Sequence, residues 1–165
     1  MIKLISKENK AILVFVIKFF LLFVILFLLI SFSNLTFLNN FFAEYSAKIF
    51  GLEYFSNIIF GENINFVITN FCTGLVSVAI LFSIIFAFKK PILINKSIIF
   101  VLGALILLIF NFFRILFVIF MAKIGFDAEL IHSITWFVMS FLILFFWFYV
   151  NKLLLGYKKL NELLS

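Results

Sequence analysis

Three residues that together could carry out acyl transfer occur once each in this sequence: Cys72, Arg114 and His132. A cysteine attacks a carbonyl as its thiolate, and the pKa of a thiol falls beside a cation or at a helix N-terminus. A guanidinium can donate hydrogen bonds to the oxyanion that forms on the attacked carbonyl. A histidine titrates near neutral pH and can pass a proton to the leaving amine. Together they would suffice for acyl transfer through a thioester.

The composition predicts that these residues belong to a membrane protein. Of the 165 residues, 67% are apolar and 29 are phenylalanine, whereas soluble domains are nearer half apolar. Apolar runs of about twenty residues are long enough to cross a bilayer. We therefore expect one all-α membrane-embedded domain over residues 1–165, with no separate soluble module.

Four apolar runs predict four transmembrane helices, at about 12–32, 71–88, 97–122 and 131–150. The first run is too long for a signal peptide and no small-residue cleavage site follows it, so we expect an uncleaved span. Lys18 lies inside this run, and its long side chain can reach back to the interface.

The wetter stretch between the first two spans predicts an amphipathic helix on the outer membrane surface. Its apolar positions recur at helical spacing: Leu38, Phe41, Phe42, Tyr45, Ile49 and Leu52. Gly51 is suited to end this helix. Two β-rich runs, 57–60 and 64–68, then flank Gly61-Glu62-Asn63 and indicate a short hairpin, although runs this short are also compatible with helix.

The lysines predict the orientation of the chain in the membrane. Nine of them lie at the N-terminus, after the second span or in the tail: Lys3, Lys7, Lys10, Lys89, Lys90, Lys96, Lys152, Lys158 and Lys159. The other loops hold only Lys48 and Lys123 beside five acidic residues. Since lysine-rich loops stay inside, we expect both termini in the cytoplasm, which agrees with an even number of spans.

This map brings the three single residues to one membrane face. Cys72 opens the second span at its outer end, and His132 opens the fourth. Arg114 comes 17 residues after Ser97, which is roughly 25 Å from the inner start of the third span. Polar groups at such depth are costly in lipid unless they have a function or partners.

Each of the three residues also has a structural interpretation. A lone cysteine in an apolar segment is often a small buried hydrophobe. A histidine at the end of a span is often an interfacial residue, and an arginine can extend its side chain to the surface. No acidic residue lies inside a predicted span, so a partner for Arg114 must be another polar group, water or substrate. This favours a site that awaits an anion or a carbonyl.

Four neighbouring residues are candidates for a supporting role. Asn111, three positions before Arg114 on the same helical face, could hold the guanidinium or a substrate carbonyl, or bond another helix. Thr135 could orient His132 or bond back to its own helix. Thr73 and Gly74 follow the cysteine and could let two backbones approach closely. Trp136 is interpreted as a packing or interfacial aromatic.

The order of these motifs resembles the exosortase/archaeosortase family. The resemblance rests on Cys72-Thr73-Gly74-Leu75 at the start of a span, Asn111-Phe-Phe-Arg114-Ile115 near the end of the next, and His132 in the last. The hairpin-like segment before the cysteine also resembles that family, and the likeness covers about 52–150. Many relatives carry more spans, so this chain would be a minimal catalytic core or a branch with a narrow substrate.

The resemblance implies a membrane-embedded cysteine transpeptidase, a thiol protease in type. Its substrates would be exported proteins that end in a short motif, a transmembrane helix and a basic tail. The enzyme would cut near the motif and pass the new C-terminus to an acceptor, inferred to be a lipid. Cys72 would be the nucleophile, Arg114 would stabilise the thiolate or oxyanion, and His132, a position that varies among branches, would be the acid/base. The site would face outward from the cytoplasmic membrane.

Other functions are excluded or left open by the same residues. The twelve lysines flank apolar runs and form no single basic face, so the net charge of +6 does not indicate a nucleic-acid partner. One cysteine and one histidine are too few for a structural zinc site, and no metal or cofactor is expected. A non-catalytic multi-pass subunit of an assembly or transport complex remains an alternative, as does hydrolysis with water as the acceptor.

Overall fold

The computed structural model describes residues 7–61 and 64–155 of the chain. The hairpin turn at Glu62 and Asn63 lies outside the described residues, as do Lys3, Lys158 and Lys159 of the orientation argument. Within the described part the chain is mainly helical, with five α-helices, a 3-10 helix and one small sheet.

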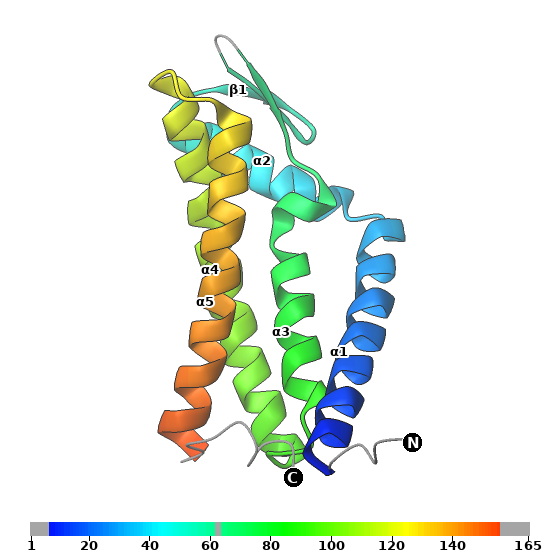
Figure 1. The fold of residues 1–165 in the computed structure, drawn as a ribbon. Coiled ribbons are helices and arrows are strands. Elements are labelled where there is room, and N and C mark those ends of the chain that lie inside the picture. Colours follow the sequence, from blue (N-terminus) through cyan, green and yellow to red (C-terminus); the bar gives the residue numbers. More distant parts are fainter. Residues whose placement is uncertain (1–6, 62–63, 156–165) are drawn as a thin grey trace, which may run out of the picture.

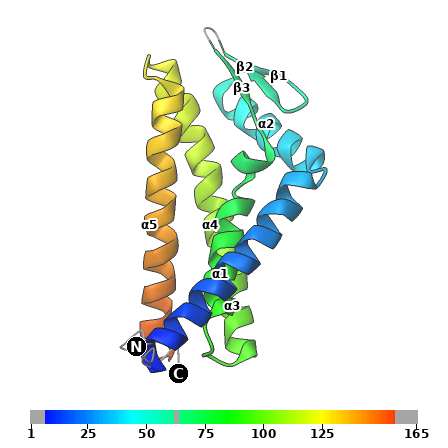
Figure 2. The ribbon, with the colours of Figure 1, turned by 45° about the vertical axis from the view of Figure 1, so that its right-hand side comes forward.

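Four helices form a bundle, and a small cap covers one end of it (Figure 1). They are α1 (Lys7–Phe32), α3 (Leu75–Ala87), α4 (Leu93–Lys123) and α5 (Ala128–Leu155). By length and apolar character three of them, α1, α4 and α5, could cross a membrane. The N-terminal end of α1 and the C-terminal end of α5 lie at the same end of the bundle, opposite the cap (Figures 1 and 2).

The cap consists of one helix and a three-stranded antiparallel sheet. Helix α2 (Thr36–Phe50) lies across the ends of the bundle helices, as Figure 1 shows. Strands β1 (Glu53–Phe55), β2 (Ile58–Phe60) and β3 (Asn65–Val67) follow in the order β1-β2-β3. Gly51 ends α2 with a φ of 63°, a left-handed conformation that suits glycine. The helix and the hairpin predicted here are present, and β1 adds a strand that the sequence did not indicate.

The second predicted span differs most from its expectation. The run 71–88 is expected as one helix, but α3 has 13 residues and begins at Leu75, after a 3-10 helix at Asn70–Thr73 (η1). At 1.5 Å per residue, α3 is about 20 Å long, so it is shorter than the three long helices. The other bounds shift too, because α4 begins at Leu93 inside the expected loop, and α5 begins at Ala128.

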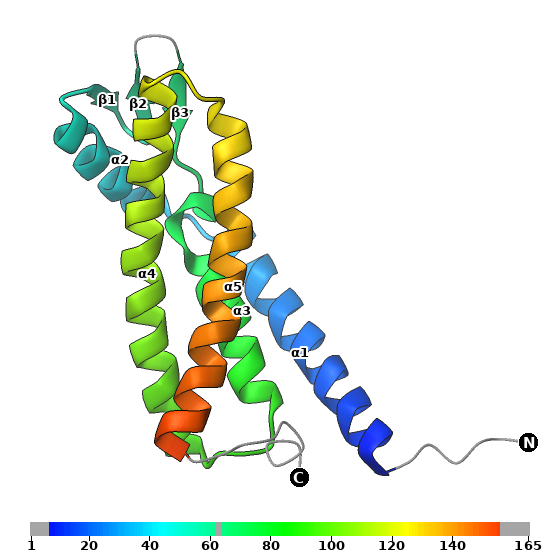
Figure 3. The same cartoon turned by 60° about the vertical axis from the view of Figure 1, so that its left-hand side comes forward.

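Apolar packing holds α3, α4 and α5 together away from the cap. The buried cluster there takes residues from all three helices, together with Phe88 just after α3: Leu81, Ile84, Ile85, Phe88, Ile99, Leu107, Met139, Ile143 and Trp147. The Phe88 and Trp147 rings stack with centroids 4.8 Å apart. Helix α1 runs beside α3 and diverges from α4 and α5 (Figure 3). Its Phe15 ring reaches the cluster, 4.3 Å from the Phe88 ring.

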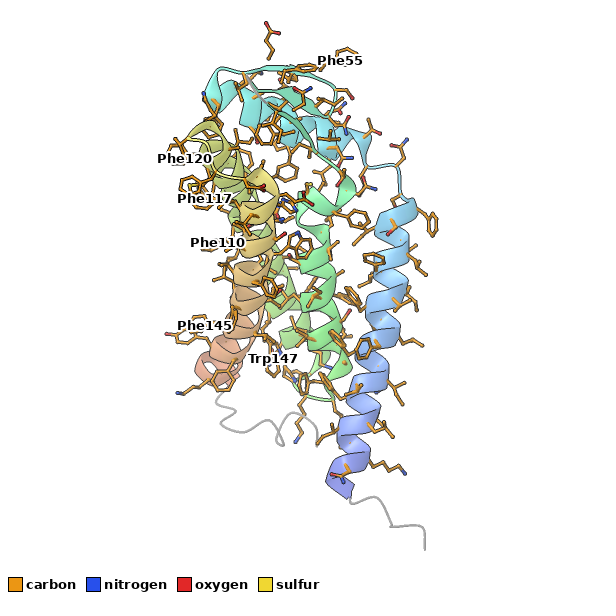
Figure 4. All side chains as sticks on the ribbon, turned by 45° about the horizontal axis from the view of Figure 1, so that its top comes forward. Phe55, Phe110, Phe117, Phe120, Phe145 and Trp147 are labelled. Carbon is orange, nitrogen blue, oxygen red and sulfur yellow. The ribbon has the colours of Figure 1, made fainter. Side chains whose placement is uncertain are left out.

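The outer surface of the bundle is apolar as well. Phe110, Phe117 and Phe120 project from α4 away from the other helices, and Phe145 does the same on α5 (Figure 4). Each of these rings is 47% or more exposed. Large exposed apolar faces on long helices are expected where lipid is the solvent, which agrees with a membrane location.

Candidate active site

Cys72 lies in the 3-10 helix that joins the sheet to the bundle. Its backbone N–H donates to Thr69 O at 2.8 Å, and its Sγ lies 3.5 Å from Thr69 Oγ1. Thr73, fully buried, donates its hydroxyl proton to Asn70 O at 2.6 Å and tightens the same turn. The sequence placed the thiol at the start of a transmembrane helix. This was wrong, because Gly74 intervenes before α3 begins.

Gly74 lets this turn contact α4 directly. Its φ is +86°, and a Cβ built there would lie 2.8 Å from Cβ of Asn111. Glycine is therefore required twice, by the left-handed backbone and by the close approach. The Asn111 Nδ2 group donates to Cys72 O at 2.7 Å across this contact. The backbone of the cysteine is thus fixed against α4.

Asn70 ties the same turn to the cap and to α1. Its Nδ2 donates to Ile30 O at 3.0 Å and to Ser33 O at 3.1 Å, two carbonyls at the C-terminal end of α1. Its Oδ1 accepts from Asn39 Nδ2 of α2 at 2.9 Å. Carbonyls at a helix end have no partner within the helix, so this side chain satisfies them and links three elements around Cys72.

Arg114 is buried, 6% exposed, and its guanidinium is held by polar groups of α4 and α5. Nε donates to Thr135 Oγ1 at 3.0 Å, and Nη1 donates to Asn111 Oδ1 at 3.1 Å. Nη2 lies 2.9 Å from His132 Nε2 and 3.3 Å from His132 Nδ1. No carboxylate of the described residues forms a salt bridge with it. A buried cation is usually paired with an anion, so this one has room for an additional acceptor.

His132 lies in the second turn of α5 rather than at the start of the span. Trp136 Nε1 donates to His132 Nε2 at 3.2 Å. Indole N–H groups and guanidinium groups are donors only, so Nε2 is the accepting nitrogen and Nδ1 carries the proton in this arrangement. The Trp136 ring also lies 5.0 Å from Cζ of Arg114, a distance typical of cation–π contact.

A pocket of about 340 Å³ joins the three single residues. Cys72, Arg114 and His132 all line it, although they come from η1, α4 and α5. Residues 64–68, which include β3, form another wall, and the apolar lining comes from this segment and from α4. Glu129, one turn before His132, contributes a carboxylate. The pocket lies at the cap end of the bundle, opposite the N-terminal end of α1 and the C-terminal end of α5.

The supporting residues take more specific positions than their patterns indicated. Asn111 holds the guanidinium and also bonds the turn of Cys72, which combines two interpretations left open. Thr135 donates to the backbone oxygen of His132 at 2.8 Å and accepts from Arg114, so it orients the guanidinium rather than the imidazole. The contacts of Trp136 with His132 and with Arg114 were not predicted. The spacing of four residues from His132 does place Trp136 on the same helical face.

No cluster of three or more metal-binding side chains (His, Cys, Asp or Glu) occurs in the described part of the chain.

In comparisons with known proteins, no protein-family model, no curated protein and no solved structure matches the chain.

Proposed function

We propose that this protein is a membrane-embedded cysteine transpeptidase of the exosortase/archaeosortase type. It cleaves the C-terminal sorting signal of exported proteins and transfers the new C-terminus to an acceptor, a membrane lipid. The observation that carries the proposal is that Cys72, Arg114 and His132, each single in the sequence, line one pocket from three different elements.

The first half of the reaction forms a thioester. Cys72 Sγ attacks the carbonyl carbon of the scissile amide, and a C–S bond forms as the carbonyl oxygen becomes an oxyanion. Thr135 and Asn111 fix Nε and Nη1 of Arg114, which leaves Nη2 to donate to that oxyanion. The C–N bond then breaks, and the amine leaves with a proton.

His132 handles the protons in this scheme. In the structure its Nε2 is engaged by Nη2 of Arg114 and by Trp136. When a substrate oxygen takes Nη2, the 3.2 Å hydrogen bond from Trp136 is the contact left at Nε2. Nε2 exchanges it for the thiol proton and then protonates the leaving amine. In the second half it removes a proton from the acceptor hydroxyl or amine, which attacks the thioester and regenerates the thiol.

The contacts of Arg114 argue against the non-catalytic alternative. A structural subunit would pair a buried guanidinium with a carboxylate or point it at a partner helix, and would leave Cys72 against lipid. Here the guanidinium is held by neutral groups of α4 and α5 and faces the same pocket as the thiol. A cation that is held in place without an anion can stabilise the oxyanion that develops on the substrate.

The experiment that tests the proposal is co-expression of the chain with a reporter. The reporter carries an exported domain, an extended segment, an apolar helix and a basic tail, drawn from proteins encoded beside this chain. The mass of the reporter C-terminus is measured with the intact chain and with Cys72→Ala. We expect trimming by the intact chain alone, with an activity loss of at least about 10³-fold in Cys72→Ala. Equal trimming by both variants, at equal amounts of folded protein, would refute thiol catalysis.

The mass of the trimmed reporter also distinguishes transfer from hydrolysis. A C-terminus with the mass of a free acid indicates water as the acceptor, and an added mass identifies the acceptor.

A Ser77→Ala variant is the matched control, because Ser77 is a buried polar residue of α3 that does not line the pocket. It is expected to trim as the wild type does.

A further inference from the structure

The edge of the small sheet faces the candidate active site. The strand order β1-β2-β3 leaves β3 with a neighbour on one side alone, and residues 64–68 line the pocket that contains Cys72. The chain then passes from β3 through Thr69 into the turn of the cysteine. The free edge and the thiol are therefore parts of one continuous segment.

The backbone groups of two residues on this edge are unpaired. The Ile68 N–H donates to Asn57 O of the β2 side at 2.8 Å. Since the bonding direction alternates along an antiparallel strand, the N–H and C=O groups of Asn65 and Val67 point away from β2. Among the described residues no hydrogen bond to these groups is present. Both residues are exposed, Val67 to 53%.

An unpaired edge of this kind is a template for another strand. Proteins that bind extended peptides often do so by adding the peptide to such an edge, which supplies affinity through the main chain. Burying these groups without partners would be costly, so an occupant of the pocket gains by pairing with them. An occupant that brings its own N–H and C=O groups is an extended peptide.

The pocket also carries one carboxylate that forms no salt bridge with the described residues. Glu129 lines it from α5, and the salt bridge found among the described residues joins Lys48 to Glu44 instead. The guanidinium of Arg114 also lines the pocket, but in the proposed reaction its Nη2 donates to the oxyanion. A basic side chain on the occupant would complement the carboxylate, and an acidic one would meet repulsion.

Resting on the proposed function, we infer that the substrate segment before the scissile bond binds as an added strand on β3, parallel to it, with a basic side chain toward Glu129. The direction follows from topology. Strand β3 runs from the far end of the sheet toward η1 and the bundle (Figure 1). A substrate that has an exported domain outside and a transmembrane helix after its motif must descend in the same direction.

The direct test maps which substrate residues lie beside the edge. A photoreactive p-benzoylphenylalanine is placed at position 65, 67 or 54 of a full-length Cys72→Ala chain, which is co-expressed with the reporter described above. Tyr54 is the matched control, because it is the outward-facing residue of β1 at the other edge of the sheet. After illumination, mass spectrometry identifies the reporter residues captured from each position.

Parallel pairing predicts an ordered result. Position 67 should capture reporter residues about two places C-terminal to those captured from position 65, because both chains advance together. Position 54 should capture little. The reverse order would overturn the parallel direction, and equal capture from position 54 would overturn the edge as the binding site.

A second measurement uses activity. Val67→Pro removes one outward N–H without touching the ladder to β2, and proline is tolerated at such an edge. We expect it to slow trimming about tenfold, the equivalent of one lost hydrogen bond with its local geometry, while Tyr54→Pro stays within about twofold. Val67→Thr, which keeps the N–H, should trim like the wild type. Equal rates for the two proline variants would overturn the inference.

The charge of the segment is tested by exchange. A reporter with lysine in the captured segment should be trimmed about fivefold faster than one with glutamate, as expected for a partly exposed charge pair. Glu129→Lys should reverse this preference, and an unchanged preference would overturn the role of Glu129.

The two proposals can fail separately. Trimming by the intact chain without capture from positions 65 and 67 refutes strand addition alone. Neither trimming nor capture refutes the transpeptidase and, with it, this inference.

Discussion

The two ends of the bundle are held together by different kinds of contact. Away from the cap, Leu81, Leu107 and Ile143 pack in a cluster that is almost wholly apolar. At the cap end, the side chains of Asn111, Arg114 and His132 bond one another in a buried polar network. The first end gains from any apolar side chain of suitable volume. The second depends on particular donors and acceptors, because each unmet polar group is costly.

This difference separates stability from activity in the molecule. Packing between α3, α4 and α5 brings the helices together and sets their spacing. The polar network, through Asn111 and Gly74, then fixes where Cys72 stands relative to the guanidinium. Substitutions at the two ends should therefore have opposite profiles, with the largest activity losses at the cap end.

Of the substitutions that compare the two ends, Arg114→Lys is expected to have the largest effect on activity. Lysine keeps the charge but cannot bond Thr135, Asn111 and His132 at once, since it lacks the planar fork. Loss of an oxyanion donor typically lowers the rate about 10²–10³-fold. Reporter trimming with a thermal unfolding curve of the same preparation measures both. Normal trimming by Arg114→Lys would mean that a point charge suffices.

Gly74→Ala should come next. The added Cβ would meet Asn111 at 2.8 Å, so the turn must move away from α4. The matched control is Gly125→Ala, because Gly125 has a φ of +93° but open space around it. Both variants should be destabilised by backbone strain of about 1–2 kcal/mol. Only Gly74→Ala should also trim the reporter more slowly, by about tenfold, because it displaces the nucleophile. Equal losses would show that strain alone is responsible.

Leu107→Ala tests the apolar end. Leu107 is 1% exposed and lies in the cluster of α3, α4 and α5. The cavity should destabilise the protein by about 2–4 kcal/mol, while the trimming rate per folded molecule changes less than about twofold. Denaturant unfolding in detergent and active-site titration provide the two values. A large loss of activity in the folded fraction would link the two ends of the bundle more tightly than their contacts indicate.

The smallest effect is expected for Glu44→Gln on α2. Glu44 accepts from Lys48 at 2.6 Å, and the hydrogen bond and charge of Lys48 lower the pKa of this carboxyl. A lowered pKa stabilises the fold above the ordinary range of glutamate, and the contribution is lost as the pH falls through the folded value. Both side chains reach solvent, 59% exposed for Lys48 and 37% for Glu44, so the variant should unfold like the wild type at neutral pH. Its stability should fall less than that of the wild type when the pH is lowered.

Apolar periodicity was enough to predict most helices. The runs around α1, α4 and α5 are long, and the spacing of α2 with Gly51 after it is a clear amphipathic pattern. The number of spans is less well determined, since α3 has 13 residues. Thr73 and Gly74 stand inside an apolar run, and nothing local distinguishes a turn there from a helix. The contact of Gly74 with Asn111 decides it, and that contact joins residues distant in sequence.

The site was predictable in its members and less so in its connections. Three residue types that occur once each drew attention to Cys72, Arg114 and His132, and helical spacing added Asn111 and Thr135. The catalytic roles of all five stay predictions. The link from Asn70 to α1 and α2 and the donor role of Trp136 depend on side-chain directions, which spacing alone does not fix. Strand β1 was missed because Glu53–Phe55 contains no β-branched residue, whereas β2 and β3 contain isoleucine or valine.

The shortness of α3 has a consequence for distance along the membrane normal. A bilayer has an apolar thickness of about 30 Å, whereas α3 is about 20 Å long. In the orientation that the lysines predict, Ala87 is at the inner end of α3, and the turn of Cys72 lies below the outer lipid boundary. Under the proposed function, the length of α3 sets the height of Cys72 above the inner face of the membrane. A substrate helix anchored by its basic tail at the inner face would be cut at a fixed height from that anchor, so lengthening the substrate helix by one turn should shift the cut by the same number of residues.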